Sequence, residues 1–152
     1  MANPFPFVAN TVLTAAQLNG IGEAAVTFTP TFTNYTRGNG TSVAYYMRVN
    51  KLIYLYLKET LGSTSSVTGA ITLTLPVTAS RTQAIETSRG RIEDVGANNF
   101  WSTALADATN YVILYAELTS GTYNALQGIS ATIPMTWTST DNFSMAFVYE
   151  AA

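Results

Sequence analysis

The sequence predicts an all-β protein, built as a sandwich or barrel of about eight short antiparallel strands. Three observations support this prediction. From Thr27 onward, several segments alternate apolar and polar residues with a period of two, as half-buried strands do. Turn signals such as Gly38-Asn39-Gly40 separate these segments. Helical signals are confined to one short stretch near the start of the chain.

Residues 1–24 differ from the rest and are predicted to form an N-terminal anchoring arm, followed by a β-sandwich domain over residues 25–152. Pro4 and Pro6 favour an extended backbone. Thr14 and Gln17 form a capping box and Gly20 suits a helix stop, so one short helical turn is expected there. Exposed apolar segments need a partner, so docking on another protein is favoured over packing against the chain's own domain. The expected virion-anchoring contacts are Phe5, Phe7, Val8 and Leu18.

The first strands after the arm are defined by alternation. The segment 27–33 alternates around Pro30, which makes it an edge strand or a bulged one. The segment 42–49 places Val43, Tyr45, Met47 and Val49 on one face.

The segment 52–57 is nearly all apolar, so both of its faces must be covered. It is therefore a central strand, or one beneath a subunit contact, with Ile53, Leu55 and Leu57 facing inward. Alternating Ile71, Leu73 and Leu75 mark the next strand.

The second half of the chain begins with a weaker signal over residues 78–97, where Arg89, Arg91 and Glu93 share a face. The segments 100–105 and 111–118 are two further strands joined by a turn through 107–110. The segment 129–137 is expected as a strand broken by Pro134. The last strand, 143–149, has the aromatic and apolar side chains of alternate residues on one face.

Composition limits the functional classes. Only 11% of residues are charged, against roughly 25% in a typical soluble domain, which favours a surface covered in an oligomer or larger assembly. The net charge is −2 and the seven basic residues are scattered, so nucleic-acid binding is not expected. No stretch has the roughly 18 apolar residues of a membrane span, and the first residues do not form a secretory signal.

Chemistry-bearing residues are scarce. The chain has no cysteine and no histidine, which excludes thiol chemistry, histidine bases and the commonest metal ligands. Phosphate-binding and calcium-binding loops are also absent from the sequence. We therefore expect no enzyme, no cofactor, and no catalytic or metal site.

Tyrosines and tryptophans are the remaining candidates for recognition. These residue types dominate protein interfaces and can also stack on sugars, and the interface or core role is the more common one. Trp101 and Trp137 belong to the set that could stack on a carbohydrate. The residues expected at a subunit interface are Tyr46, Tyr54, Tyr56, Tyr111 and Tyr115.

An ordered series of motifs resembles a domain that recurs in virion proteins of tailed bacteriophages. The series contains Phe28-Thr29-Pro30-Thr31-Phe32, a Gly-rich turn at 38–41 and a Tyr46-Met47-Arg48-Val49-Asn50-Lys51 hairpin. It ends with Pro134-Met135-Thr136-Trp137 leading to Asp141, and a terminal Tyr149-Glu150. Asn50 stands where that family usually has glycine, so this hairpin is expected to differ in detail. The arm around Ala15-Ala16-Gln17-Leu18-Asn19 is similar to leaders that precede such domains.

This resemblance implies a jelly-roll-like or tumour-necrosis-factor-like β-sandwich that forms homotrimers. The implied role is a structural protein of the virion, made in the host cytoplasm. Its partners would be other copies of itself and another virion protein, such as the major capsid protein or a tail component. The short arm favours a capsid decoration or cement protein. A head-fibre protein belongs to the same group, and the alternative is a tail or tail-fibre adhesin that recognises a host surface glycan.

Overall fold

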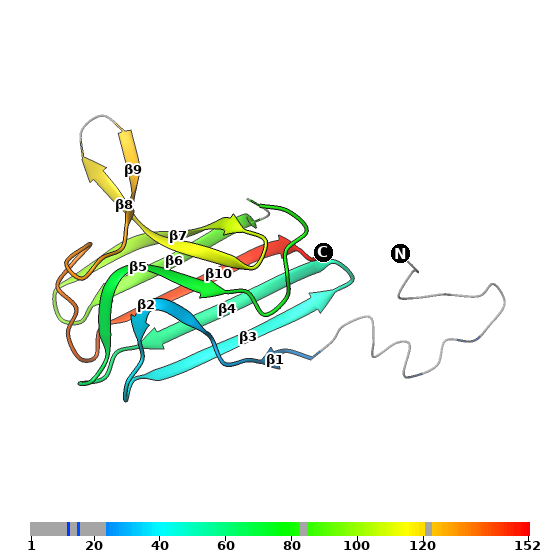
Figure 1. Cartoon of the computed structure of the whole chain (residues 1–152), viewed down its shortest axis with the longest axis horizontal. Helices are drawn as coiled ribbons and strands as arrows, with labels where there is room; N and C mark the ends of the chain where they lie inside the picture. Colours follow the sequence, from blue (N-terminus) through cyan, green and yellow to red (C-terminus); the bar gives the residue numbers. More distant parts are fainter. Residues whose placement is uncertain (1–11, 13–14, 16–23, 83–84, 121–122) are drawn as a thin grey trace.

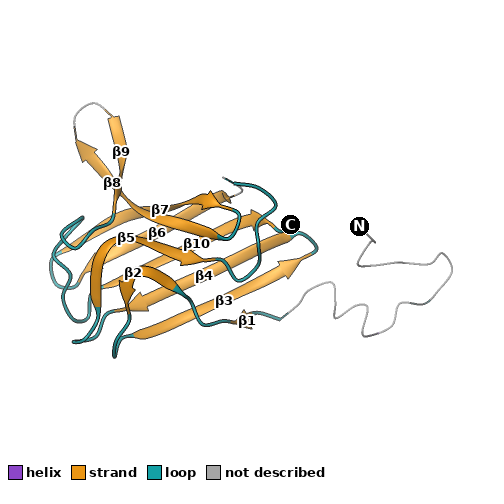
Figure 2. Ribbon diagram, viewed as in Figure 1, coloured by secondary structure: helices purple, strands orange, loops and turns teal. Residues whose placement is uncertain are grey.

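Antiparallel strands make up most of the described chain in this computed structural model (Figures 1 and 2). The structure describes residues 12, 15, 24–82, 85–120 and 123–152. The ten strands within these residues are β1 (Val26–Thr27), β2 (Phe32–Thr36), β3 (Thr41–Val49), β4 (Leu52–Thr60), β5 (Ser66–Thr74), β6 (Ile85–Asp94), β7 (Asn98–Ala108), β8 (Tyr111–Ser120), β9 (Tyr123–Gly128) and β10 (Asn142–Glu150).

One curled sheet contains all of these strands. Its order is β1-β3-β4-β10-β6-β7-β8-β5-β2, and β9 pairs with β8 outside this path. The sheet curls so that β5 and β2 lie over β4 and β10 (Figure 1). Ring contacts confirm this layering, because Phe32 and Tyr35 of β2 lie edge-on against Phe143 of β10, at centroid distances of 6.0 and 5.2 Å. The expected all-β, jelly-roll-like class is therefore confirmed.

The core lies between the two layers and is built from the inward residues of each strand. On β10 the inward side chains of Phe143, Met145, Phe147 and Tyr149 are at most 1% exposed. Full burial of each such side chain contributes roughly 1.5–3 kcal/mol. The predicted inward face of β4 is confirmed, since Ile53, Leu55 and Leu57 are fully buried between β3 and β10.

Two predicted strands differ in the structure, and one strand of the structure was not predicted. The segment 27–33 forms two strands, because Pro30 lacks the amide hydrogen that continued pairing needs. This stretch instead passes from β3 to β5: the Phe28 amide donates to the Ala44 carbonyl, and the Thr74 amide donates to the Thr31 carbonyl. The segment 129–137 is a loop with one isolated bridge rather than a strand. β9 was not predicted.

The predicted turns keep their positions. Gly38 has a φ of 56° in the turn between β2 and β3, yet these strands pair with β5 and with β4 rather than with each other. Asn50 takes a φ of 54° in the two-residue turn between Val49 and Leu52, so asparagine fills the left-handed position that glycine would otherwise occupy. Of the predicted helical turn only Ala15 is described, and it is helical.

Candidate docking surfaces

The outer surface of β3 and β4 is apolar, although it points away from the core. The period of two that buries Ala44, Ile53 and Leu55 turns their neighbours outward. Val43, Val49 and Leu52 are 54%, 50% and 52% exposed. We call this surface the β3–β4 face, and its residues are Val43, Tyr45, Met47, Val49, Leu52, Tyr54 and Tyr56.

Strand register brings these side chains together. Tyr45 lies opposite Tyr56 and Met47 opposite Tyr54 across the β3–β4 ladder. The Tyr45 and Tyr56 rings are stacked with centroids 5.2 Å apart and planes at 26°. Burial raises the pKa of Tyr54 above its ordinary value, and the neighbouring Tyr45 and Tyr56 add to this effect.

The expected interface tyrosines fall in different places. Tyr54 and Tyr56 lie on the β3–β4 face. Tyr111 and Tyr115 are half-buried on the outer side of β8, with β10, β6 and β7 between them and β4. Tyr46 faces the opposite side of β3, half-buried against the core, and its ring meets Phe28 edge-on at 6.1 Å. The predicted arm contacts Phe5, Phe7, Val8 and Leu18 lie outside the described residues.

The two tryptophans, which could stack on a carbohydrate, have different environments. Trp101 on β7 is 62% exposed, and the Arg89 guanidinium lies 5.8 Å from its ring centroid. Arg89 also approaches Glu117 to 3.9 Å. Trp137 is half-buried, donates its indole hydrogen to the Ser130 carbonyl at 2.9 Å, and meets Phe143 edge-on. Only Trp101 therefore offers an open ring face.

A cleft lies where the hairpin of β8 and β9 leaves the body of the sheet. The β7–β8 pairing ends at Ser102 opposite Ala116, whereas the β8–β9 pairing continues from Tyr115 to Ser120. Beyond Ala116 the hairpin projects from the sheet (Figure 1). The space between them is a cleft of about 280 Å³, lined by Phe100, Ala116, Glu117, Leu118, Gln127, Ile133 and Pro134.

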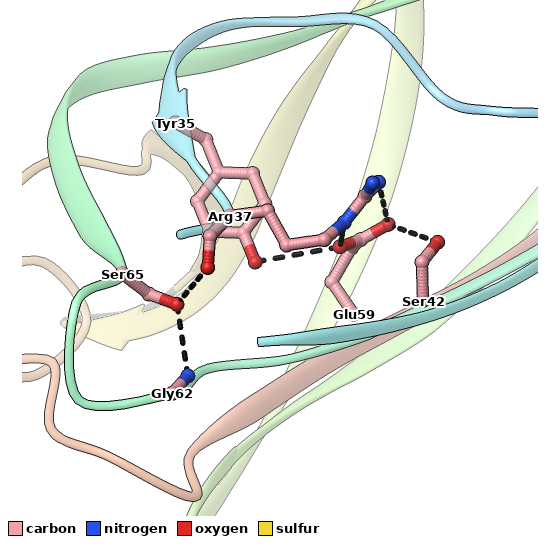
Figure 3. A network of polar contacts seen from close by, with 6 residues as sticks. All are labelled: Tyr35, Arg37, Ser42, Glu59, Gly62 and Ser65. Carbon is pink, nitrogen blue, oxygen red and sulfur yellow. Dashed lines mark hydrogen bonds and ion pairs between the residues drawn. The ribbon is translucent and has the colours of Figure 1, made fainter. Parts of the chain in front are cut away.

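A buried carboxylate joins the strands at one end of the sheet (Figure 3). Glu59 is fully buried on β4, and the Arg37 guanidinium donates to both of its oxygens at 2.7 and 2.8 Å. The Ser42 hydroxyl donates to Glu59 at 2.5 Å and the Tyr35 hydroxyl at 3.4 Å. The Ser65 hydroxyl in turn donates to the Arg37 carbonyl and accepts from the Gly62 amide.

This hydrogen-bond network connects three strands, and the pKa of both Tyr35 and Arg37 is raised within it. Burial raises the pKa of the Tyr35 phenol well above its ordinary value, and the charge of Glu59 adds to the effect. The hydrogen bond to Glu59 raises the pKa of Arg37 further. Both Glu59 oxygens accept hydrogen bonds, so the arrangement clamps β2, β3 and β4 and presents no unpaired base.

Among residues 24–82, 85–120 and 123–152, no three acidic side chains gather into a metal-binding group. The helices within the described part of the chain are too short to cross a membrane. Comparisons with models of protein families, with curated proteins and with solved structures found no match to this chain.

Two features of these surfaces were missed at the level of sequence. Glu59 continues the inward series Ile53, Leu55 and Leu57, and a carboxylate at such a position signals a buried cationic partner. That signal was available, although it does not identify Arg37. The cleft had no sequence signal, because β9 is exposed along most of its length and shows no regular alternation of apolar residues.

Proposed function

We propose that this protein is a structural component of a tailed-phage virion, a homotrimeric capsid decoration or cement protein attached to the particle through its N-terminal arm. The ordered motifs from Phe28 to Glu150 supply the link to virion proteins. The β3–β4 face is the observation that carries the proposal. Large aliphatic side chains are about half exposed on this face, next to the stacked Tyr45 and Tyr56 rings. Exposed apolar surfaces rich in tyrosine are typical of protein interfaces.

The low charge of the chain supports the same role. Charged residues make up 11% of the sequence, and the Thr-rich outer surface of β5 and β2 supplies neutral polarity instead. A protein that works in a packed assembly needs less surface charge than a free monomer does. Four carboxylates of the described residues form ion pairs with arginines, as Glu93 does with Arg91 at 2.6 Å, and paired carboxylates are consistent with a scaffold; they are Glu59, Glu93, Glu117 and Glu150.

Self-association is tested by placing charge on the β3–β4 face. In light scattering, the wild-type protein should have three times the 16.3 kDa mass of the chain. The double variant Val43→Lys, Val49→Lys should be a folded monomer, because both side chains already face solvent in the single chain. Val95→Lys, at a position that is 48% exposed in a turn, is the matched control and should stay trimeric. If the double variant is still a trimer, the subunit interface does not involve the β3–β4 face.

Attachment through the arm is tested on particles that lack the protein. A variant that lacks residues 1–20 should form the same trimer as the full-length protein but should not bind these particles. If the truncated trimer still decorates them, the arm is not the anchor.

The second candidate is a tail or tail-fibre adhesin, and Trp101 is the observation that favours it. An exposed indole with a neighbouring guanidinium and carboxylate is a surface on which a sugar ring can stack and form hydrogen bonds. This role predicts glycan-dependent binding of the isolated protein to host cells. The binding should disappear with Trp101→Ala and persist with Leu105→Ala, whose side chain is also exposed on β7.

A further inference from the structure

The cleft between β7 and the β8–β9 hairpin combines two properties of a strand-binding site. First, β8 has an open edge: beyond Ala116, no described residue pairs with the side of β8 that β7 would otherwise cover. Open strand edges accept an added strand through backbone hydrogen bonds. Second, the lining side chains are mainly apolar, and Leu118 and Leu126 on the hairpin are 44% and 45% exposed.

The size of the cleft identifies the kind of group that fits. Its volume of about 280 Å³ lies just below the range of roughly 300–1,000 Å³ for sites that enclose a whole small-molecule ligand. It is suited to one large apolar side chain carried by an extended peptide, with the peptide backbone pairing along β8. Phe100, Ile133 and Pro134 offer such a side chain three apolar contacts.

The chain itself contains a segment with this chemistry outside the described residues. Residues 1–22 contain no Asp, Glu, Lys or Arg, and Pro4-Phe5-Pro6-Phe7 alternates proline with phenylalanine. In an added strand, alternate residues direct their backbone groups to the same side. When Phe5 and Phe7 pair with β8, Pro4 and Pro6 face away, where the missing amide hydrogen loses no bond. The two aromatic rings then share one face.

We propose that this cleft binds the Phe5–Phe7 segment of a second copy of the chain, as a strand added to the open edge of β8. The 17 residue steps from Val8 to Ala25 span up to about 60 Å when extended. That length exceeds the roughly 40 Å width expected for a domain of this size. β1, where the arm joins the sheet, lies on the opposite side of the molecule from the β8–β9 hairpin (Figure 1), so the arm begins far from the cleft of its own chain and its length lets it reach a second copy.

This inference rests on the proposed function only in taking the arm to be a docking segment, and it holds for the isolated assembly without any particle. Arms exchanged in this way would link the copies within one trimer and leave the rest of the arm, including Val8 and Leu18, for attachment to the particle. The absence of cysteine from the chain makes thiol crosslinking a clean test, because introduced cysteines are the only thiols present.

The experiment uses co-expressed full-length single variants and a short bis-maleimide crosslinker. Phe7→Cys with Leu118→Cys should give a heterodimer of twice the 16.3 kDa chain mass. Phe7→Cys with Ala70→Cys is the matched control, because Ala70 is exposed on β5 away from the cleft, and it should give little product. Gln127→Cys, also in the cleft lining, should crosslink to Phe7→Cys, and adding Leu118→Asp should lower that yield about tenfold.

Three results would overturn the proposal. Equal yields at positions 118 and 70 would indicate random collision. No product at either position would show that the arm does not reach the cleft. In a chain carrying both Phe7→Cys and Leu118→Cys, a crosslink formed only within the chain would show that the arm folds back on its own domain. Loss of particle labelling with an intact crosslink would instead overturn the virion role and leave this inference standing.

Discussion

Removal of the Arg37 guanidinium should destabilise the protein strongly, because it leaves the Glu59 carboxylate charged and buried. Glu59 is fully buried and accepts two charge-assisted hydrogen bonds from Arg37. Breaking a buried ion pair by deleting one partner costs about 3–5 kcal/mol. The Arg37 side chain is 27% exposed, so water reaches the pair and the lower end of that range applies. Arg37→Met should therefore cost about 3 kcal/mol, which corresponds to roughly 6–12 °C in Tm.

The measurement is urea unfolding followed by tryptophan fluorescence, at one fixed protein concentration because association shifts apparent stability. The double variant Arg37→Met, Glu59→Gln should be more stable than Arg37→Met alone, since the amide can still accept from Tyr35 and Ser42 without a buried charge. Arg91→Met is the matched control, because Arg91 and Glu93 are 48% and 28% exposed and such pairs contribute about 1 kcal/mol or less. A loss below about 1 kcal/mol for Arg37→Met, or additive losses in the double variant, would refute this reasoning.

Three further predictions concern stability. Gly90→Ala should lower the free energy of unfolding by about 1–3 kcal/mol, because a Cβ there would lie 2.4 Å from the Ser144 carbonyl oxygen. An unchanged urea midpoint would contradict the close packing of β6 against β10. Asp141→Ala should lower the free energy of unfolding by about 2–4 kcal/mol, measured in the same urea assay. This buried carboxylate accepts hydrogen bonds from the Val95 amide and from both the amide and the hydroxyl of Thr138. Burial raises the pKa of Tyr35 and Tyr149 in the folded protein above the ordinary 10.0, so the unfolded chain loses these protons first. The contribution of these two tyrosines to stability should be constant below about pH 9 and fall above about pH 10. The double variant Tyr35→Phe, Tyr149→Phe should show a shallower alkaline fall, and an identical fall would contradict this assignment.

The sheet could be predicted from sequence where alternation coincides with burial. On β4 and β10 the apolar residues at alternate positions face the core, so a period of two identifies both the strand and its inward side. On β3 the same pattern misleads. Val43, Met47 and Val49 alternate as clearly, yet they face outward and the small Ala44 is the buried residue. Alternation identifies the strand, and only the tertiary structure determines which face is inside.

In β9 and in the loop 129–137, the apolar pattern of the sequence does not correspond to the secondary structure. β9 is exposed, so no core selects an alternating pattern on it, although it forms a ladder with β8 from Tyr115 to Ser120. In the loop 129–137, Ile129 and Met135 are buried although the backbone makes no ladder. Apolar residues there fill the end of the core, which a pattern-based prediction reads as a strand. The Arg37–Glu59 contact joins residues 22 positions apart and depends on strand order, which local patterns do not contain.

Membership of a phage particle is tested most directly by immunogold electron microscopy of purified virions with an antibody against the chain. The proposed function predicts gold spread over the surface of the head. Gold confined to the tail or neck would contradict the decoration role and favour the adhesin. An absence of label from all particles would contradict the virion role itself.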